Sequence, residues 1–180
     1  MSETIIRGNK LCGAQFSPCR TWRYSLWRIW DDSEANYVAW IGLNPSKADE
    51  QQDDPTIRRV LDFSRRWGYG GVYMLNLFAF RATHPEVMMG AADPIGPEND
   101  RWILEYTEAA GCTIACWGNL GRFHNRDLHV AQIRRDSPHA KTRTIGENFR
   151  CLKVTEQGCP WHPLYVPKTA KHKPFRVRDS

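Results

Sequence analysis

Tyr37-Val38-Ala39-Trp40-Ile41-Gly42-Leu43, followed directly by Asn44-Pro45-Ser46, is the stretch of sequence that decides the fold. The first seven residues form a continuous apolar run of strand length, which is typical of a strand covered on both faces of a sheet. The next three are residues that favour a turn, so the chain is expected to leave the sheet at Asn44. In an open α/β sheet, ligands bind outside the carboxyl ends of the strands. The sequence therefore predicts a functional surface at this point.

Strand and helix signals alternate on both sides of this run. Residues 22–30 are rich in aromatic and apolar side chains and end at the turn signal Asp31-Asp32-Ser33, so we expect a strand that forms an antiparallel hairpin with residues 37–43. Asp54-Pro55 combines a helix N-cap with a proline at the first helical position, which predicts a helix over residues 55–67. The other predicted elements are strands over residues 72–76, 113–117 and 149–154 and helices over residues 97–110 and 122–135.

This alternation predicts an α/β fold. We expect a three-layer α/β/α sandwich with a central, mostly parallel sheet and an N-terminal antiparallel hairpin. A chain of 180 residues is long enough to bury a core without disulfides or metals. Residues 1–167 are expected to form a single α/β domain, and residues 168–180 a basic C-terminal tail.

Several functional classes do not fit the composition. The first ten residues lack the apolar core of a signal peptide and no apolar stretch reaches the length that spans a bilayer, so we expect a soluble, cytoplasmic protein without membrane contact. The six cysteines show no Cys-x-x-Cys spacing, and Cys112 and Cys116 lie in an apolar run, so buried thiols are expected rather than metal ligands. There is no P-loop or dinucleotide fingerprint. We therefore expect neither a metal nor a cofactor.

Positive charge is concentrated in two segments of a chain whose net charge is +5. Residues 168–180 carry five Lys or Arg against one Asp, and residues 122–143 carry six against two Asp. Such segments are typical of a surface that binds a polyanion, although a solvated helix face and a free tail give the same counts. We expect a nucleic-acid partner, DNA rather than RNA, and the sequence leaves the oligomeric state open. The residues assigned to phosphate contacts are Lys168, Lys171, Lys173, Arg176 and Arg178.

Polar side chains follow the other predicted strands as well. Asn76 ends one strand, Asn119 follows Trp117-Gly118 at the end of the next, and His162 lies in a proline-flanked loop near the end of the chain. An Asn side chain offers both a donor and an acceptor to the edge of a base, so these residues together can recognise a planar heterocycle. Plain structural roles are possible for each of them, as a turn, a satisfied buried amide or a surface histidine.

These segments resemble the motifs of the uracil-DNA glycosylase superfamily, in the same order along the chain. Gly42-Leu43-Asn44-Pro45 resembles the loop that holds the hydrolytic water, and Leu75-Asn76 resembles the strand end that reads the base. Trp117-Gly118 and His162-Pro163 resemble the third strand end and the loop whose His stabilises the departing base. The resemblance implies a uracil-DNA glycosylase-like fold, base flipping and hydrolysis of an N-glycosidic bond.

Nearly the whole chain also resembles an uncharacterised bacterial and phage family, a domain of unknown function (DUF). The motifs that carry this resemblance are Gly-Leu-Asn-Pro-Ser-x-Ala-Asp, Asp-Pro-Thr, Gly-Pro-Glu-Asn-Asp and His-Pro-Leu-Tyr. This second resemblance brings no activity with it.

Three positions depart from the glycosylase pattern. Asn44 stands where the uracil-specific branch has Asp, and an amide positions a water but cannot take its proton. Ser46 replaces a Tyr that blocks a 5-methyl group, and Leu164 replaces a small Ser that contacts a phosphate. The resemblance therefore implies a slower enzyme that tolerates a 5-substituted pyrimidine. Asp53 or Asp54 would supply the missing general base. One alternative is that Asp54 serves as a helix N-cap, and another is that the acidic run of residues 49–54 binds magnesium.

We therefore expect a hydrolase that acts on the N-glycosidic bond of a modified or damaged pyrimidine. A nucleobase-, nucleotide- or DNA-binding protein without catalysis, in a phage or bacterial DNA-modification pathway, is the alternative, and a protein-interaction domain is a third. The catalytic assignments are Asn44, His162, Asp53 and Asp54. The assignments to substrate binding are Gly42, Leu43, Pro45, Ser46, Asn76, Phe78, Trp117, Gly118, Asn119 and Pro163.

Overall fold

The apolar run forms β4 (Tyr37–Gly42), an inner strand of the sheet, in a computed structural model that describes residues 2–7, 10–31, 36–138 and 149–177. It pairs in parallel with β5 (Gly71–Asn76) on one side and with β6 (Cys112–Ala115) on the other. Its side chains from Val38 to Gly42 are buried, as the absence of polar alternation predicts. β4 is thus covered on both faces, and its carboxyl end meets those of β5 and β6 at one edge.

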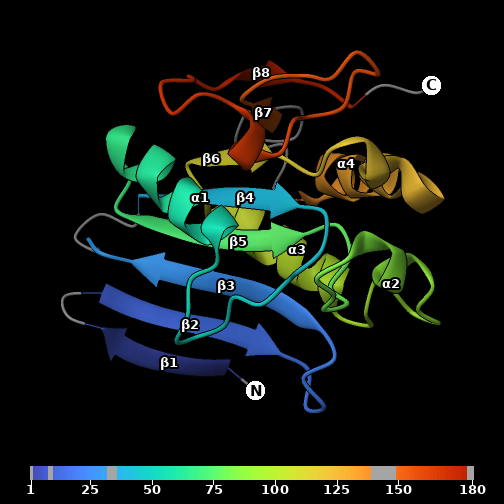
Figure 1. Ribbon diagram of the computed structural model, residues 1–180, viewed down its shortest axis with the longest axis horizontal. Helices are drawn as coiled ribbons and strands as arrows, with labels where there is room; N and C mark the ends of the chain where they lie inside the picture. The colour runs from blue at the N-terminus through green and yellow to red at the C-terminus, as the bar shows by residue number, and fades with distance from the viewer. Residues whose placement is uncertain (1, 8–9, 32–35, 139–148, 178–180) are drawn as a thin grey trace.

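The described residues form one eight-stranded sheet in the order β1-β2-β3-β5-β4-β6-β7-β8 (Figure 1). The outer strands are β1 (Ser2–Arg7), β2 (Lys10–Phe16), β3 (Arg23–Ile29), β7 (Phe149–Cys151) and β8 (Lys173–Phe175). The helices are α1 (Pro55–Arg66), α2 (Pro85–Met89), α3 (Asn99–Ala109) and α4 (Arg126–Asp136), with 3-10 turns η1 (Asn119–Asn125) and η3 (Pro163–Tyr165).

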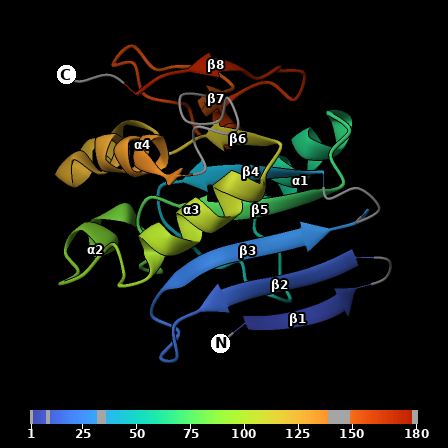
Figure 2. The same ribbon diagram turned by 180° about the vertical axis from the view of Figure 1, so that it is seen from behind.

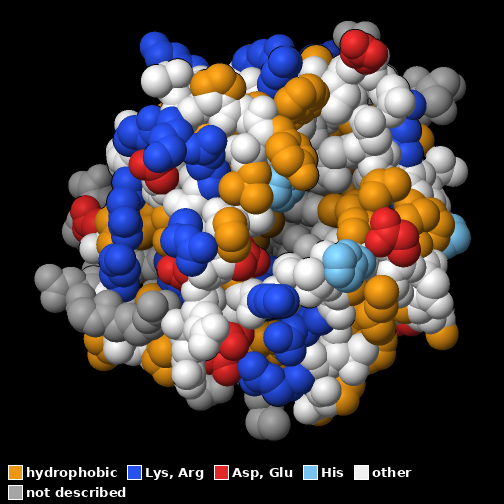
Figure 3. Space-filling view, in the orientation of Figure 1, with side chains coloured by type: hydrophobic (Ala, Val, Ile, Leu, Met, Phe, Trp, Pro, Cys, Tyr) orange, Lys and Arg blue, Asp and Glu red, His pale blue; other side chains and the backbone are white. Residues whose placement is uncertain are grey.

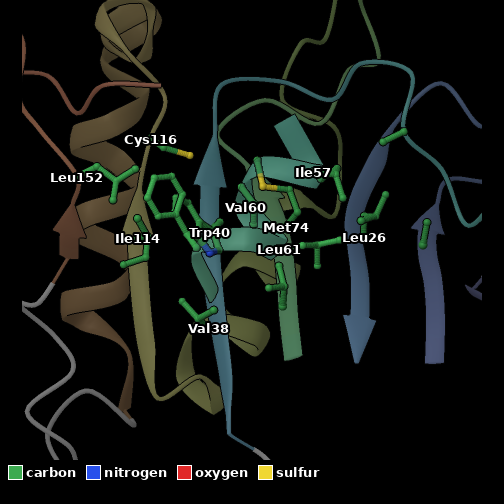
Figure 4. Packing of buried hydrophobic residues seen from close by; sticks show 14 of the residues in the cluster. Leu26, Val38, Trp40, Ile57, Val60, Leu61, Met74, Ile114, Cys116 and Leu152 are labelled. Atoms are coloured by element: carbon green, nitrogen blue, oxygen red, sulfur yellow. The ribbon is translucent and has the colours of Figure 1, made fainter. Parts of the chain in front are cut away.

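Helices cover both faces of the central strands. α1 lies on one face (Figure 1) and α3 on the other, beside α4 (Figure 2). Side chains alternate along β4, so Val38 and Trp40 pack with α1 whereas Ala39 and Ile41 pack on the α3 side. Figure 4 shows Trp40 among residues of β5, β6 and α1 in the first of these cores. The alternating elements thus give two apolar cores, one on each side of the sheet.

The prediction of a mostly parallel sheet is wrong, because the sheet is mixed. Within the described residues, parallel pairing is confined to β4–β5, β4–β6 and β6–β7. β1–β2, β2–β3, β3–β5 and β7–β8 are antiparallel. The N-terminal strands were missed in the sequence, and their short connections allow only antiparallel pairing, since a parallel connection needs a longer crossover.

The predicted hairpin between residues 22–30 and 37–43 is also wrong. β3 pairs with β2 and β5, and β5 lies between β3 and β4. Short spacing along the chain favours pairing of neighbours, but β4 is apolar on both faces and instead takes a position between two parallel strands. An N-terminal antiparallel hairpin does exist, formed by β1 and β2.

Part of the segment predicted as a basic tail belongs to the sheet. Residues 173–175 form β8, which pairs with β7, and the Phe175 side chain is buried against Trp117. A strand of three residues, Lys173-Pro174-Phe175, is too short for its pattern to be detected in the sequence. Within the described residues, no helix has both the length and the apolar character needed to cross a membrane.

Candidate functional site

A cavity of about 430 Å³ lies at the carboxyl ends of β4, β5 and β6. The short segments that leave these strands line it, together with the start of α1 and the loop before η3. It contains most of the residues that the sequence singled out. These are Gly42, Leu43, Asn44, Ser46, Asp54, Asn76, Trp117, Gly118, Asn119 and His162.

Asn44 presents an acceptor to this cavity. Its Nδ2 donates to the carbonyl oxygen of Ala82 at 2.8 Å and to that of Pro45 at 3.2 Å. Both amide hydrogens are therefore used on the backbone, and the side chain retains its Oδ1 oxygen for a ligand or water. The same bonds hold the loop after β4 against the loop after β5, and the bond from the Ala82 amide to the Pro45 carbonyl reinforces them.

Asn76 presents a donor. The residue is 1% exposed, and its Nδ2 is buried without a hydrogen-bond partner in the structure. A buried amide without partners costs about 1–3 kcal/mol, so a group of this kind at a cavity wall is suited to bind a ligand acceptor. Gly42 makes room for it, because a Cβ on Gly42 would lie 3.0 Å from the Asn76 Oδ1 and 2.7 Å from the Met74 Cε.

The backbone of Asn76 and of the next residue, Leu77, is fixed from the other face of the sheet. The buried Asn99, which opens α3, donates from Nδ2 to the carbonyl oxygens of Asn76 and Leu77 at 3.1 and 2.9 Å. Arg126 donates from Nε to the Leu77 carbonyl at 2.8 Å and also pairs with Asp100. The Gly-Pro-Glu-Asn-Asp motif therefore holds the strand end that carries Asn76.

His162 approaches the cavity from the loop before η3, which is held in place on two sides. The Gly118 amide donates to the Pro160 carbonyl at 2.8 Å, and the Arg59 guanidinium of α1 donates to the carbonyls of Pro163 and Val166. The Nδ1 of His162 accepts a long hydrogen bond of 3.4 Å from the Leu164 amide. In the neutral ring the proton is then on Nε2, which leaves a donor for a ligand.

Partial burial favours the neutral form of His162. Desolvation lowers the pKa of this imidazole below its ordinary value, and the negative charge of Asp54 opposes this only in part. A neutral imidazole donates to an oxygen that gains negative charge without first adding a positive charge to the cavity.

The two aspartates assigned to catalysis have different positions. Asp54 lines the cavity and caps α1, since its Oδ1 accepts from the Ile57 amide at 2.9 Å. Asp53 does not line the cavity and forms an ion pair of 2.8 Å with Arg28, which is 1% exposed. Asp53 thus anchors the loop between β4 and α1 to the sheet, and Asp54 is the carboxylate available to the cavity.

Arg23 is the functional candidate that the sequence reasoning missed. It is 2% exposed, lines the cavity and donates from Nη1 to the Ala48 carbonyl at 2.6 Å, while its Nε is buried without a partner. Desolvation lowers the pKa of the guanidinium to about 10, which keeps it charged at neutral pH. The signal in the sequence that points to it is an arginine within a predicted strand that is rich in aromatic and apolar residues, and Arg28 of the same strand gives the same signal.

Other assigned residues lie outside the cavity. Phe78 is fully buried and packs with Phe123, and Pro163, the first residue of η3, is buried. Pro45 contributes only its carbonyl oxygen to the contacts described above. Among the assigned phosphate contacts, Lys168, Lys171, Lys173 and Arg176 are exposed, and Arg178 lies outside the described residues.

Lys and Arg side chains gather in several groups on the α1 face of the molecule (Figure 3). The cavity itself offers donors from Asn76 and Arg23, an acceptor from Asn44 and one carboxylate, Asp54. Among the residues that the structure describes, no group of three or more His, Cys, Asp or Glu is placed to hold a metal ion. The arrangement is suited to a planar, acceptor-rich ligand and to the activation of water.

The chain was compared with known proteins. A family model described as "Protein of unknown function (DUF1643)" matches residues 23–164, which include every residue that lines the cavity except Tyr165. No curated protein and no solved structure matches the chain.

Proposed function

The chain belongs to the family of proteins of unknown function DUF1643, and from its cavity we propose that it hydrolyses the N-glycosidic bond of a modified or damaged pyrimidine in DNA. The observation that carries the proposal is the buried, unpartnered donor of Asn76 in a cavity shared with Asn44, Asp54 and His162. The same proposal includes a uracil-DNA glycosylase-like fold. It is supported by the motifs, which resemble those of that superfamily and occur in the same order along the chain.

The donors and acceptors of the cavity suit the edge of a pyrimidine. Asn76 Nδ2 and Arg23 Nε offer hydrogen bonds to carbonyl oxygens, which are the acceptors of uracil and its derivatives. Apolar contact is available from Leu43, Met74 and Trp117, which also line the cavity. The position that a Tyr would need in order to exclude a 5-substituent is occupied by the small Ser46. A pyrimidine with a 5-substituent is therefore the substrate that we propose.

The cavity also contains the groups that the reaction requires. Asn44 Oδ1 holds a water by accepting one of its hydrogens, and Asp54 takes the proton as the water oxygen bonds to the anomeric carbon. The glycosidic bond breaks, and its electron pair stays with the base. His162 Nε2–H donates to the base oxygen on which the negative charge develops. Protonation of the released base from solvent and deprotonation of Asp54 complete the balance.

Duplex oligonucleotides that each carry one uracil, 5-hydroxymethyluracil or bulkier 5-substituted pyrimidine test the proposal. Abasic sites are scored by alkaline cleavage. We expect product from at least one substituted base, loss of that product in Asn76→Ala and His162→Ala, and no loss in His84→Ala, whose histidine is exposed and outside the cavity. A folded protein that forms no abasic site on any of these substrates would refute the proposal.

One observation favours a second candidate, in which the cavity binds a nucleobase without cleaving it. Both amide hydrogens of Asn44 are engaged by the backbone, and the Asp54 Oδ1 is engaged as a helix cap. Salt-sensitive DNA binding that selects a base, is lost in Asn76→Ala and gives no abasic site would favour this candidate over the enzyme.

A further inference from the structure

A second cavity of about 380 Å³ adjoins the first one. The two share Ser46, Ala82 and Thr83 as lining residues, so they open into one continuous surface. The rest of the second cavity comes from the turn between β2 and β3, from Lys47 in the loop after β4, and from the segment after β5. We refer to it as the Arg81 cavity.

The Arg81 cavity is lined by cations and hydroxyl groups. Its charged residues are Arg20, Lys47 and Arg81, its hydroxyl residues are Thr21, Ser46 and Thr83, and no carboxylate lines it. Arg20 is partly neutralised by a 2.9 Å ion pair with Glu50. Arg81 and Lys47 have no carboxylate partner within the described residues, and the Arg81 Nε is buried without a hydrogen-bond partner. A surface of this composition binds an anion with several oxygens.

The two guanidinium groups are held in place before any ligand arrives. Both contact the ring of Phe16, with the Arg20 Cζ at 3.9 Å from its centroid and the Arg81 Cζ at 4.9 Å. Arg81 also donates from Nη1 to the Arg20 carbonyl at 3.3 Å, and its amide donates to the Thr21 carbonyl. Two like charges that share one aromatic ring repel each other, and an anion bound between them removes this repulsion.

The buried Arg23 lines the first cavity and is within electrostatic reach of Arg81. It lines the first cavity with an unpartnered Nε, and the positive charge of Arg81 is close enough to lower the pKa of its guanidinium. Arg23 and Arg81 thus place positive charge on both cavities, and in the first cavity the carboxylate of Asp54 opposes it.

We propose that the Arg81 cavity binds the phosphate group of the nucleotide whose base occupies the neighbouring cavity. The inference rests on the proposed function, because it assigns the phosphate site of the same substrate. A phosphate bound by Arg20, Arg81 and Lys47 fixes the nucleotide while Asn76 contacts its base. The phosphate belongs either to a DNA strand or to a free nucleotide, since the chemistry of recognition is the same.

Binding of deoxyuridine, deoxyuridine 5′-monophosphate and a short uracil-containing single strand, measured by calorimetry over a range of salt, tests this inference. We expect Arg81→Gln and Lys47→Gln each to weaken binding of the phosphorylated probes by about ten- to a hundredfold, since each removes a charge-assisted contact. Binding of deoxyuridine should not change. Arg101→Gln is the matched control, because Arg101 is exposed, lies on α3 and is absent from both cavities.

The outcomes separate the two sources of phosphate. Equal effects on the monophosphate and the strand indicate a free nucleotide, whereas effects on the strand alone, with a salt slope lower by about one unit per lost contact, indicate a nucleic-acid backbone. Lys47 is exposed and has no ion-pair partner among the described residues, so Lys47→Gln remains informative if Arg81→Gln fails to fold. The inference is overturned if both variants bind every phosphorylated probe as the Arg101→Gln control does.

Failure of the proposed function gives a different result. In that case, binding of the phosphorylated probes still depends on Arg81 and Lys47, but Asn76→Ala leaves the preference for the base unchanged and no abasic site forms. This result supports the phosphate site and refutes the glycosylase proposal.

Discussion

Asn76 and Asn99 are both buried amides, yet their Nδ2 groups are used differently. The Nδ2 of Asn99 donates to two backbone carbonyls, whereas the Nδ2 of Asn76 has no partner. The Asn99 Oδ1 is also buried without a partner, but Asn99 does not line the cavity, whereas Asn76 does. Position at the cavity together with a donor without a partner gives Asn76 the ligand-binding role, and the two donated bonds give Asn99 the structural one.

The pair gives a prediction about stability. We expect Asn99→Ala to lower the free energy of unfolding by about 2 kcal/mol, because it removes two buried hydrogen bonds. Asn76→Ala should lower it by less than about 1 kcal/mol, since it removes a donor that has no partner. Urea denaturation of both variants measures this. Equal destabilisation by the two substitutions would make Asn76 a structural residue.

Two half-buried histidines, His162 and His172, make a prediction about pH. Burial lowers the pKa of His162, and burial together with the charge of Arg150 lowers that of His172. The unfolded chain, in which a histidine has a pKa of about 6.5, therefore binds these protons more readily than the folded protein. Their contribution to stability is complete above about pH 6.5 and is lost as the pH falls toward the lowered values of the folded state.

We expect the free energy of unfolding to decrease between about pH 7 and pH 5, and the double variant His162→Gln, His172→Gln to reduce this decrease. Urea denaturation across this range is the measurement, with His84→Gln, at an exposed position, as the control. A slope that the double variant does not alter would assign the pH dependence to other groups.

At the scale of the element, the start of α1 combines a structural and a chemical role in one residue. Asp54 caps the helix through Oδ1 and lines the cavity, while Pro55 takes the first helical position. The helix therefore places a carboxylate at the carboxyl end of the sheet, and its Arg59 holds the loop that carries His162. Substitutions at Asp54 can separate the two roles, because Asn also caps helices but has no carboxylate.

We expect Asp54→Asn to keep the free energy of unfolding within about 0.5 kcal/mol of the natural protein and Asp54→Ala to lower it by about 1 kcal/mol. Both variants should lose turnover of the 5-substituted pyrimidine substrate if Asp54 is the general base. Denaturation and single-turnover kinetics are measured on the same samples. Full turnover by Asp54→Asn would leave Asp54 as a helix cap only.

At the scale of the whole molecule, the strand β8 near the end of the chain forms one edge of the sheet. β8 pairs with β7, and Phe175 contacts Trp117, which lines the cavity. Removing the chain after Val166 would therefore damage the core as well as remove positive charge. Stability and charge in this segment have to be tested by separate substitutions.

We expect Phe175→Ala to lower the free energy of unfolding by about 3 kcal/mol, as deletion of a buried aromatic ring does. Phe175→Leu, which keeps an apolar side chain, should lower the free energy of unfolding by less. Thermal or urea denaturation measures the difference. A Phe175→Ala variant as stable as the natural protein would show that β8 adds nothing to the core.

The exposed lysines of the same segment make the complementary prediction. We expect the triple variant Lys168→Gln, Lys171→Gln, Lys173→Gln to keep the free energy of unfolding within about 0.5 kcal/mol of that of the natural protein. DNA binding should weaken for all sequences, and the salt slope should fall by about one unit for each lost phosphate contact. Binding isotherms at several salt concentrations are the measurement. An unchanged affinity and slope would restrict phosphate contact to other surfaces.

The sequence by itself determined the local structure of this protein. The apolar run 37–43, the Asp54-Pro55 cap and the polar strand ends identified β4, α1 and the edge where Asn44, Asn76 and His162 meet. Continuous apolar runs and caps act over a few residues, so their signals are complete within a short window.

Tertiary structure alone decided which strands pair and which buried charges meet. Three features join segments that are distant in sequence, so no local pattern specifies them. They are the position of β5 between β3 and β4, the pairing of β8 with β7, and the ion pair of Asp53 with Arg28. The same holds for Arg23 and for the Arg81 cavity, which is formed where three separate segments meet. Burial and charge pairing depend on neighbours in space, and only the fold determines those neighbours.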